Sequence, residues 1–146
     1  MGYIESNLLP GETVVQRARL HWIVFLKAAA VFVVGLGLLF IEPRTVGMIV
    51  VGLGLLMAIP PWVQRVSSEF GITNKRVIIK VGFFQRRTIE LLIRQVEAIS
   101  VDQTVAGRVF NFGTVVLSGT GGVRGEFHNI SNPLEFRRSI QSLSTS

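Results

Sequence analysis

Hydrophobic and polar positions divide the chain into two apolar runs followed by a long alternating section. Residues 22–41 and 46–63 are almost entirely apolar, with Lys27 as their one charge, and only EPRT (42–45) separates them. A helix that crosses the ~30 Å hydrocarbon core of a bilayer needs about 20 residues. The pattern therefore predicts a transmembrane helical hairpin over residues 22–63, preceded by a segment at 1–21.

From residue 64 onward the pattern is that of strands. RVIIKV (76–81) alternates, which predicts Val77, Ile79 and Val81 on one face and Arg76, Ile78 and Lys80 on the other. Further strands are predicted at 87–93, 98–101, 114–118 and 123–130. SGTGG (118–122) joins two of these strands, and this context favours a hairpin turn over a phosphate-binding loop.

The last residues predict an amphipathic helix. Asn132 is placed to cap it and Pro133 suits the first helical position. Phe136, Ile140 and Leu143 follow at helical spacing and form one apolar face.

The predicted fold is therefore α+β with a transmembrane helical hairpin. Two spans, 22–41 and 46–63, precede a domain at 64–146 built as an antiparallel β-roll or barrel and closed by the C-terminal helix. A cleaved signal peptide is a weaker interpretation of the first run, because mostly polar residues precede it and no small-residue cleavage site follows. A buried core hairpin is weaker too, because 146 residues cannot surround two apolar helices with protein.

The heptapeptide VVGLGLL occurs twice, at 33–39 and 50–56. A dinucleotide-binding loop needs a strand before it and a third glycine, and both copies lack these. Folding at EPRT brings Gly35 and Gly37 to the depth of Gly52 and Gly54, and small residues let helices approach closely in lipid. Ala58 adds a small residue one turn after Gly54. These five residues are predicted to pack helices, either within the hairpin or between two copies of the chain.

Charge predicts the orientation of the hairpin. Arg17 and Arg19 precede the first span and several Lys and Arg follow the second, so the positive-inside rule places both termini in the cytoplasm. Trp22 and Trp62 are predicted interfacial anchors, and Lys27 can extend back to the same headgroups. The prolines at 60–61 are expected to bend or end the second helix.

The net charge of +6 and the pI of about 11.1 raise the question of an anionic partner. Five basic residues gather around the predicted hairpin of strands: Lys75, Arg76, Lys80, Arg86 and Arg87. They are candidates for facing anionic lipid headgroups, each worth about 1 kcal/mol near the membrane surface. The alternative is a solvated basic face. Nucleic acid is not an expected partner, because no helix-turn-helix or RNA-recognition signature appears.

Candidate chemistry is sparse. The chain has no cysteine, two histidines and one aspartate. His21 and His128 lie alone, at positions typical of interfacial or surface residues, and no motif predicts a catalytic triad or a metal site. We expect no catalytic residue, no cofactor and no metal.

Three stretches carry a family resemblance: LLPGETVVQRARLHW (8–22), ITNKRVIIKVGFFQRRTIELLIRQVEAISVDQ (72–103) and GTVVLSGTGG (113–122). With the two-span hairpin between the first and second, the chain resembles the bacterial membrane-flanked PH-like (pleckstrin homology) domain family. The resemblance implies a roll of about seven strands with a C-terminal helix, held on the cytoplasmic face of the bacterial plasma membrane. It implies no particular activity.

These observations favour a non-catalytic adaptor or scaffold that acts through a protein partner or through self-association as a homo-oligomer. Two alternatives remain open. One is sensing of anionic phospholipid through the basic hairpin, and the other is an accessory regulatory role beside a membrane transporter or protease.

Overall fold

The computed structural model describes residues 2–83 and 85–145. It contains two compact units, one formed by Met1–His21 with Ser67–Ser146 and the other by Trp22–Val66. The first unit therefore combines segments from both sides of the apolar runs.

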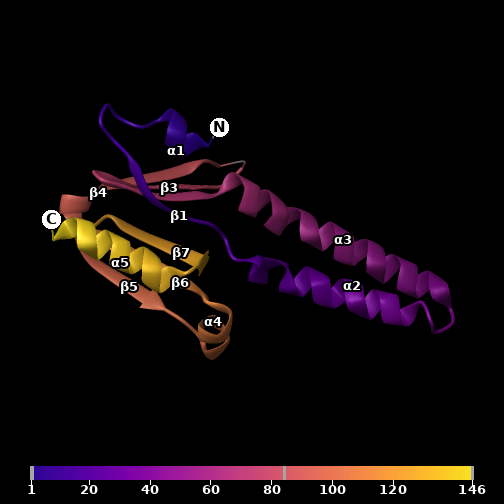
Figure 1. Ribbon diagram of the computed structural model, residues 1–146. Helices are drawn as coiled ribbons and strands as arrows, with labels where there is room; N and C mark the ends of the chain where they lie inside the picture. The colour runs from indigo at the N-terminus through magenta and orange to yellow at the C-terminus, as the bar shows by residue number, and fades with distance from the viewer. Residues whose placement is uncertain (1, 84, 146) are drawn as a thin grey trace. The chain divides into compact units, whose positions relative to one another are not determined.

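Four antiparallel strands form the first sheet of this unit (Figure 1). In order across the sheet they are β1 (Val14–Ala18), β2 (Glu69–Thr73), β3 (Arg76–Val81) and β4 (Arg87–Leu92). β1 lies before the apolar runs in sequence and β2 after them, yet Arg17 stands opposite Gly71 in the ladder. The strand predicted at 76–81 is present with those bounds.

The second sheet has three antiparallel strands, β5 (Val96–Asp102), β6 (Phe112–Gly119) and β7 (Arg124–Ser131). The short helix η2 (Ile93–Gln95) leads from β4 into it, and α4 (Val105–Phe110) lies between β5 and β6. Just after β1, the chain also pairs with β7 of the second sheet. Leu20 forms a β-bridge with Ile130, and the His21 amide donates a hydrogen bond of 2.7 Å to the Asn129 carbonyl.

The core of this unit is apolar and draws on both sheets and on helix α5 (Pro133–Ser144). The Phe70 ring of β2 meets the Phe127 ring of β7 edge to face, with centroids 5.9 Å apart. Phe136 and Ile140 of α5 are fully buried, as their spacing predicts. Burial of each such side chain stabilises the fold by about 1.5–3 kcal/mol. The α+β fold with antiparallel sheets is thus confirmed.

The start of α5 differs from the expectation in one respect. Asn132 does occupy the N-cap position, but its side chain makes no capping hydrogen bond. Its Oδ1 accepts instead from the Nδ2 of Asn111, the residue that ends α4. Both asparagines have left-handed backbones, with φ of 52° and 59°, a conformation that Asn tolerates better than most residues. The paired side chains therefore fasten the end of α4 to the start of α5.

The second unit consists of η1 (Trp22–Phe25), α2 (Leu26–Leu38) and α3 (Arg44–Ser67). In the described residues, α3 alone is long and apolar enough to cross a membrane; the helical stretch Trp22–Leu38 is apolar but shorter. Helix α3 continues through Pro60 and Pro61 to Ser67, so these prolines do not end the helix, which was one of the two expectations for them.

Candidate functional site

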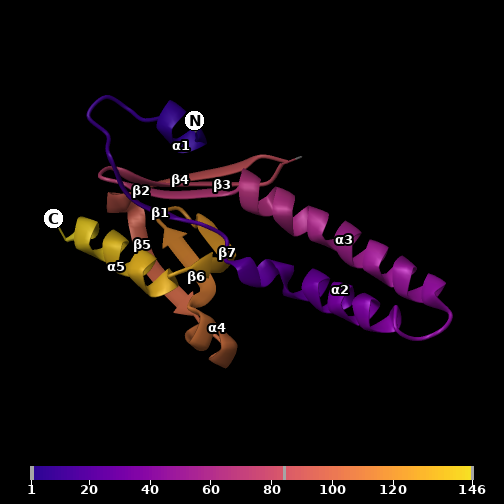
Figure 2. The same ribbon diagram turned by 45° about the vertical axis from the view of Figure 1, so that its right-hand side comes forward.

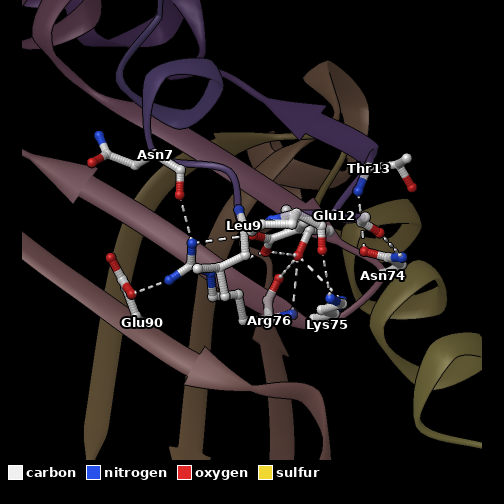
Figure 3. Close-up of polar contacts among 11 residues, drawn as sticks. Asn7, Leu9, Glu12, Thr13, Asn74, Lys75, Arg76 and Glu90 are labelled. Atoms are coloured by element: carbon white, nitrogen blue, oxygen red, sulfur yellow. Dashed lines mark hydrogen bonds and ion pairs between the residues drawn. The ribbon is translucent and has the colours of Figure 1, made fainter.

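The most elaborate polar cluster in the described chain joins the LPGE stretch (9–12) to the turn between β2 and β3 (Figure 3). At its centre, the Glu12 side chain is 0% exposed. Its Oε2 accepts from the Leu9 amide at 2.7 Å, and its Oε1 accepts from the Thr73 hydroxyl at 2.6 Å. The carboxylate is thus held both by its own loop and by β2.

Arg76, the first residue of β3, completes this cluster. Its Nε donates to Glu12 Oε1 at 3.0 Å and its Nη2 to Glu12 Oε2 at 3.1 Å, a two-point contact. Nη2 also donates to the Asn7 carbonyl at 2.7 Å, and Nη1 pairs with Glu90 of β4. The arginine therefore ties residues 7–12 to two strands of the sheet.

These contacts change the titration of both partners. Burial alone raises the pKa of Glu12, but hydrogen bonds from Arg76, the Leu9 amide and Thr73, with the arginine's charge, outweigh it and lower the pKa to about 2. The hydrogen bond to Glu12 is the largest cause of a raised pKa of Arg76. The pair is fixed in its charged form at neutral pH, which suits a structural fastening and not proton transfer.

Two further side chains of the β2–β3 turn bind backbone groups of residues 10–13. The Asn74 side chain accepts from the Thr13 amide at 3.1 Å and donates to the Gly11 carbonyl at 3.2 Å. The Lys75 ammonium donates to the Pro10 carbonyl at 3.1 Å. The stretches LPGE and TNKR, 61 to 65 positions apart at these contacts, thus form one interlocked turn.

Residues 2–13, which we call the N-terminal strap, also cover the outer face of the first sheet. The short helix α1 (Tyr3–Ser6) presents the amides of Tyr3 and Ile4 to the Glu69 carboxylate, at 3.0 and 3.2 Å. Ile4 is buried over Gly71, where an added Cβ would meet its Cδ1 at 2.6 Å. Since Ile78 stands opposite Gly71 in the ladder, this cover explains why Ile78 is buried although it faces away from Val77 and Ile79.

The strap engages three of the five basic candidates for lipid headgroups. Arg76 and Lys75 bind it as described, and the Lys80 ammonium lies 4.8 Å from the centre of the Tyr3 ring, a cation–π contact. Arg86, just before β4, and Arg87, its first residue, are exposed and form no ion pair with a described residue. The structure thus divides the five residues into three that contact the strap, of which Lys75 is itself exposed, and two that do not.

In the second unit, the predicted helix-packing glycines fall into two classes. A Cβ on Gly35 would lie 2.6 Å from the Val51 backbone, and one on Gly54 would lie 2.8 Å from the Phe32 backbone. Gly37 and Gly52 face open space, where an added Cβ meets nothing within 4 Å. Gly47 makes a third close approach, 2.7 Å from the Leu39 backbone, which sequence reasoning missed because it lies outside the repeated heptapeptide. Each packing glycine thus meets a larger residue and not another glycine.

The remaining predicted residues of this unit are largely exposed. Trp22, Lys27 and Trp62 all expose their side chains, and Ala58 is half-buried. These are the exposures that interfacial anchors need.

Groups able to do chemistry do not converge. In residues 2–83 and 85–145, no three His, Asp or Glu side chains are grouped as a metal site requires. His21 is buried, with its ring 5.2 Å from that of Phe112, so it is not a surface residue. His128 is exposed beside Thr114 and Glu126.

Comparison with known proteins gives one match. A family model described as Bacterial PH domain matches residues 23–144, a range that includes the second unit, strands β2 to β7 and helix α5. Neither the curated proteins nor the solved structures give a match. PH domains are generally non-catalytic.

Proposed function

This chain belongs to the bacterial PH domain family, and from that premise we propose that it is a non-catalytic adaptor held at the cytoplasmic face of the bacterial membrane. The second unit is the anchor and crosses the bilayer twice, as the spans 22–41 and 46–63. The first unit associates with a protein partner or with a second copy of the chain.

The pairing of β1 with β2 is the observation that carries this proposal. These strands flank the whole second unit in sequence, yet Ala18 pairs with Phe70 and Arg17 with Gly71. Both ends of the second unit must therefore lie on the same side of any membrane. If the second unit crossed a membrane once, β1 and β2 would lie on opposite sides and could not pair. A chain that inserts α3, its 24-residue apolar helix, therefore has to cross an even number of times.

The surface of the second unit supports insertion. Phe40 is 92% exposed, and other large apolar side chains are exposed with it: Val34, Ile41, Ile49, Leu56 and Ile59. Soluble proteins rarely leave such contiguous apolar area to water, whereas lipid covers it at no cost. With about 1.5 Å per residue, α3 is about 36 Å long. The stretch Trp22–Leu38, partly 3₁₀, reaches about 28 Å.

The open edge of the first sheet supports association. β4 is the last strand in its order and pairs only with β3 among the described strands. Arg87, Thr88 and Glu90 on it are exposed. An unpaired edge offers a row of backbone donors and acceptors to an added strand.

Cysteine accessibility in intact cells tests the anchor and its orientation, because the chain has no cysteine of its own. Glu42→Cys, in the connection between α2 and α3, should react with an impermeant maleimide added outside, and Thr120→Cys in the β6–β7 turn should react only after lysis. Extraction of the protein by carbonate, or outside labelling of Thr120→Cys, contradicts the proposal.

Photo-crosslinking in native membranes tests the association. A photoreactive residue at Thr88 on the β4 edge should give a discrete adduct with one partner or with a second copy. The same residue at Gln141, exposed on α5, is the matched control. Equal and diffuse adducts from both positions would argue against an adaptor that uses this edge.

A second candidate function is recognition of anionic phospholipid, favoured by the exposure of Arg86 and Arg87. Lys75, Arg76 and Lys80 support it less, because the strap occupies them. Reversing the charge of both exposed arginines should then deplete anionic lipid co-purified with the full chain. Reversal of Arg124 and Arg137, exposed elsewhere, should not.

A further inference from the structure

Helix α4 is a short, firmly held projection of the first unit. Thr104 caps its start, with the side-chain oxygen accepting from the Gly107 amide at 3.1 Å. Gly107 packs so closely that an added Cβ would lie 2.6 Å from the Phe112 carbonyl. Asn111 ends the helix and is tied to Asn132, as described above. The helix is therefore a fixed element and not a mobile loop.

The side chains that α4 projects outward are apolar. Val105 is 82% exposed and Val109 is 73% exposed, and Phe110 exposes about half of its side chain at 48%. Arg108 is exposed between them, and the helix contains no acidic residue. Isolated exposed apolar residues are ordinary, but three on one six-residue helix form an apolar tip with a single cation.

This tip lies beside the place where the chain leaves the first unit for the apolar helices. Gly107 rests on the Phe112 carbonyl, and the Phe112 ring packs on the His21 ring with centroids 5.2 Å apart. The next residue after His21, Trp22, begins the second unit. Phe112 thus contacts both Gly107 of this helix and His21 at the exit of the chain. Helix α4 itself lies at the end of the second sheet, where β5 ends (Figure 2).

We propose that α4 is a membrane-contact tip. Val105, Val109 and Phe110 enter the interfacial layer of the bilayer, and Arg108 pairs with lipid phosphate. This inference rests on the proposed anchor, which keeps the exit at His21, and with it the tip, close to the headgroups. Segments that lie in the membrane interface combine an apolar face that enters the lipid with a cation that pairs with headgroups.

The size of the tip favours a bilayer over a protein. A stable protein interface buries about 800 Å² on each partner, more than one helix of six residues can offer. A tethered domain, in contrast, needs only a small contact, because the anchor already holds it at the surface. The consequence is that the first unit takes a defined orientation against the membrane.

Fluorescence quenching in proteoliposomes of the full chain tests this inference. Three single-cysteine variants carry the same environment-sensitive dye: Val109→Cys on the tip, Thr120→Cys as the control, and Leu53→Cys in α3. Thr120 follows β6, and α4 precedes it, so the two labels are separated by the eight-residue length of that strand, about 24 Å. Lipids with a nitroxide high on the acyl chain are the quencher, in vesicles containing phosphatidylglycerol.

We expect the Val109 label to lose about half of its emission, the Leu53 label to be quenched and the Thr120 label to keep its emission. Adding Val105→Asp should restore the emission at position 109. If Leu53 is quenched and Val109 is not, the tip proposal is wrong while the anchor stands. If the Leu53 label is not quenched, the proposed membrane anchor is wrong, and the tip proposal, which rests on it, is wrong as well. A blue-shifted but unquenched Val109 label means that protein covers the tip, which also overturns the inference.

Discussion

The guanidinium of Arg76 donates two hydrogen bonds to the carboxylate of Glu12, a residue 64 positions earlier in the sequence. Both side chains are almost fully removed from solvent. The two residues belong to LPGE and ITNKRVI, the pieces that point most specifically to the family resemblance. Their contact gives those pieces a physical purpose, because it fixes the strap to the sheet and completes the turn between β2 and β3.

We predict that Glu12→Gln lowers the free energy of unfolding by about 3 kcal/mol, since it removes the carboxylate that Arg76 contacts at two points and leaves Glu90 as the ion-pair partner of this guanidinium. Thermal unfolding of the full chain in detergent, followed by circular dichroism of the strands, measures the change. Glu5→Gln is the matched control, because the pair of Glu5 with Arg17 is exposed and solvent screens it. Equal effects of the two substitutions would contradict the central role of Glu12.

The same carboxylate predicts a dependence of stability on pH. The pKa of Glu12 is about 2 in the fold and 4.5 ordinarily, so its stabilising contribution is complete above pH 4.5 and is lost as the pH falls toward 2. Glu5 also has a lowered pKa, caused first by the hydrogen bond from Arg17, but it is fully exposed and adds little. Acid titration of the melting temperature should show a steep fall in this range, and Glu12→Gln should flatten it. An unchanged slope in the variant would show that other groups dominate.

Two glycines of the same heptapeptide should respond differently to alanine. Gly54→Ala places a methyl group 2.8 Å from the Phe32 backbone, so the helices must separate, at a cost of about 1–3 kcal/mol. Gly52→Ala meets nothing within 4 Å and should be neutral or slightly stabilising. Loss of helical circular dichroism against rising sodium dodecyl sulfate ranks the two variants. Similar losses would mean that these helices do not pack as described.

Removal of the Ile4 side chain should loosen the strap. Ile4→Ala deletes the apolar cover of Gly71 and Ile78, and buried Ile→Ala changes cost about 2–5 kcal/mol. Because the strap is terminal, we expect most of this loss as local opening, read as faster hydrogen exchange of the Tyr3 and Ile4 amides. Leu9→Ala, at a half-exposed position, should leave that exchange unchanged. Slow exchange in both variants would show that the Glu69 carboxylate suffices to hold α1.

Strands that alternate, and a helix with a clear apolar face, could be predicted from sequence. Ile89 and Leu91 of β4 alternate with the exposed Thr88 and Glu90, and Phe136 and Ile140 recur at helical spacing, so burial of a single face produced a recognisable pattern. β2 was missed because Phe70 to Thr73 are all buried, which removes any alternation. Its second face is covered by Ile4, a residue from a distant segment that no local pattern reveals.

Site residues were harder to predict for the same reason. The five basic residues look equivalent in sequence, but only the strap decides that Arg76 is nearly buried while Arg87 is exposed. The glycine repeat makes its four glycines look equivalent, whereas the rotation of each helix places Gly35 and Gly54 against the other helix and leaves Gly37 and Gly52 facing open space. Helix α4 carries three exposed apolar side chains that any pattern would assign to a core.

The order of β1 and β2 along the chain has a consequence for biogenesis. A ribosome releases β1 early, and its neighbour in the ladder emerges only after every residue of Trp22–Val66 has been translated. Until then, the nascent chain carries a lone strand that has nothing to pair with. Completion of the sheet is therefore a late step that follows synthesis of both helices, and a molecule arrested halfway would expose β1 to chaperones and proteases.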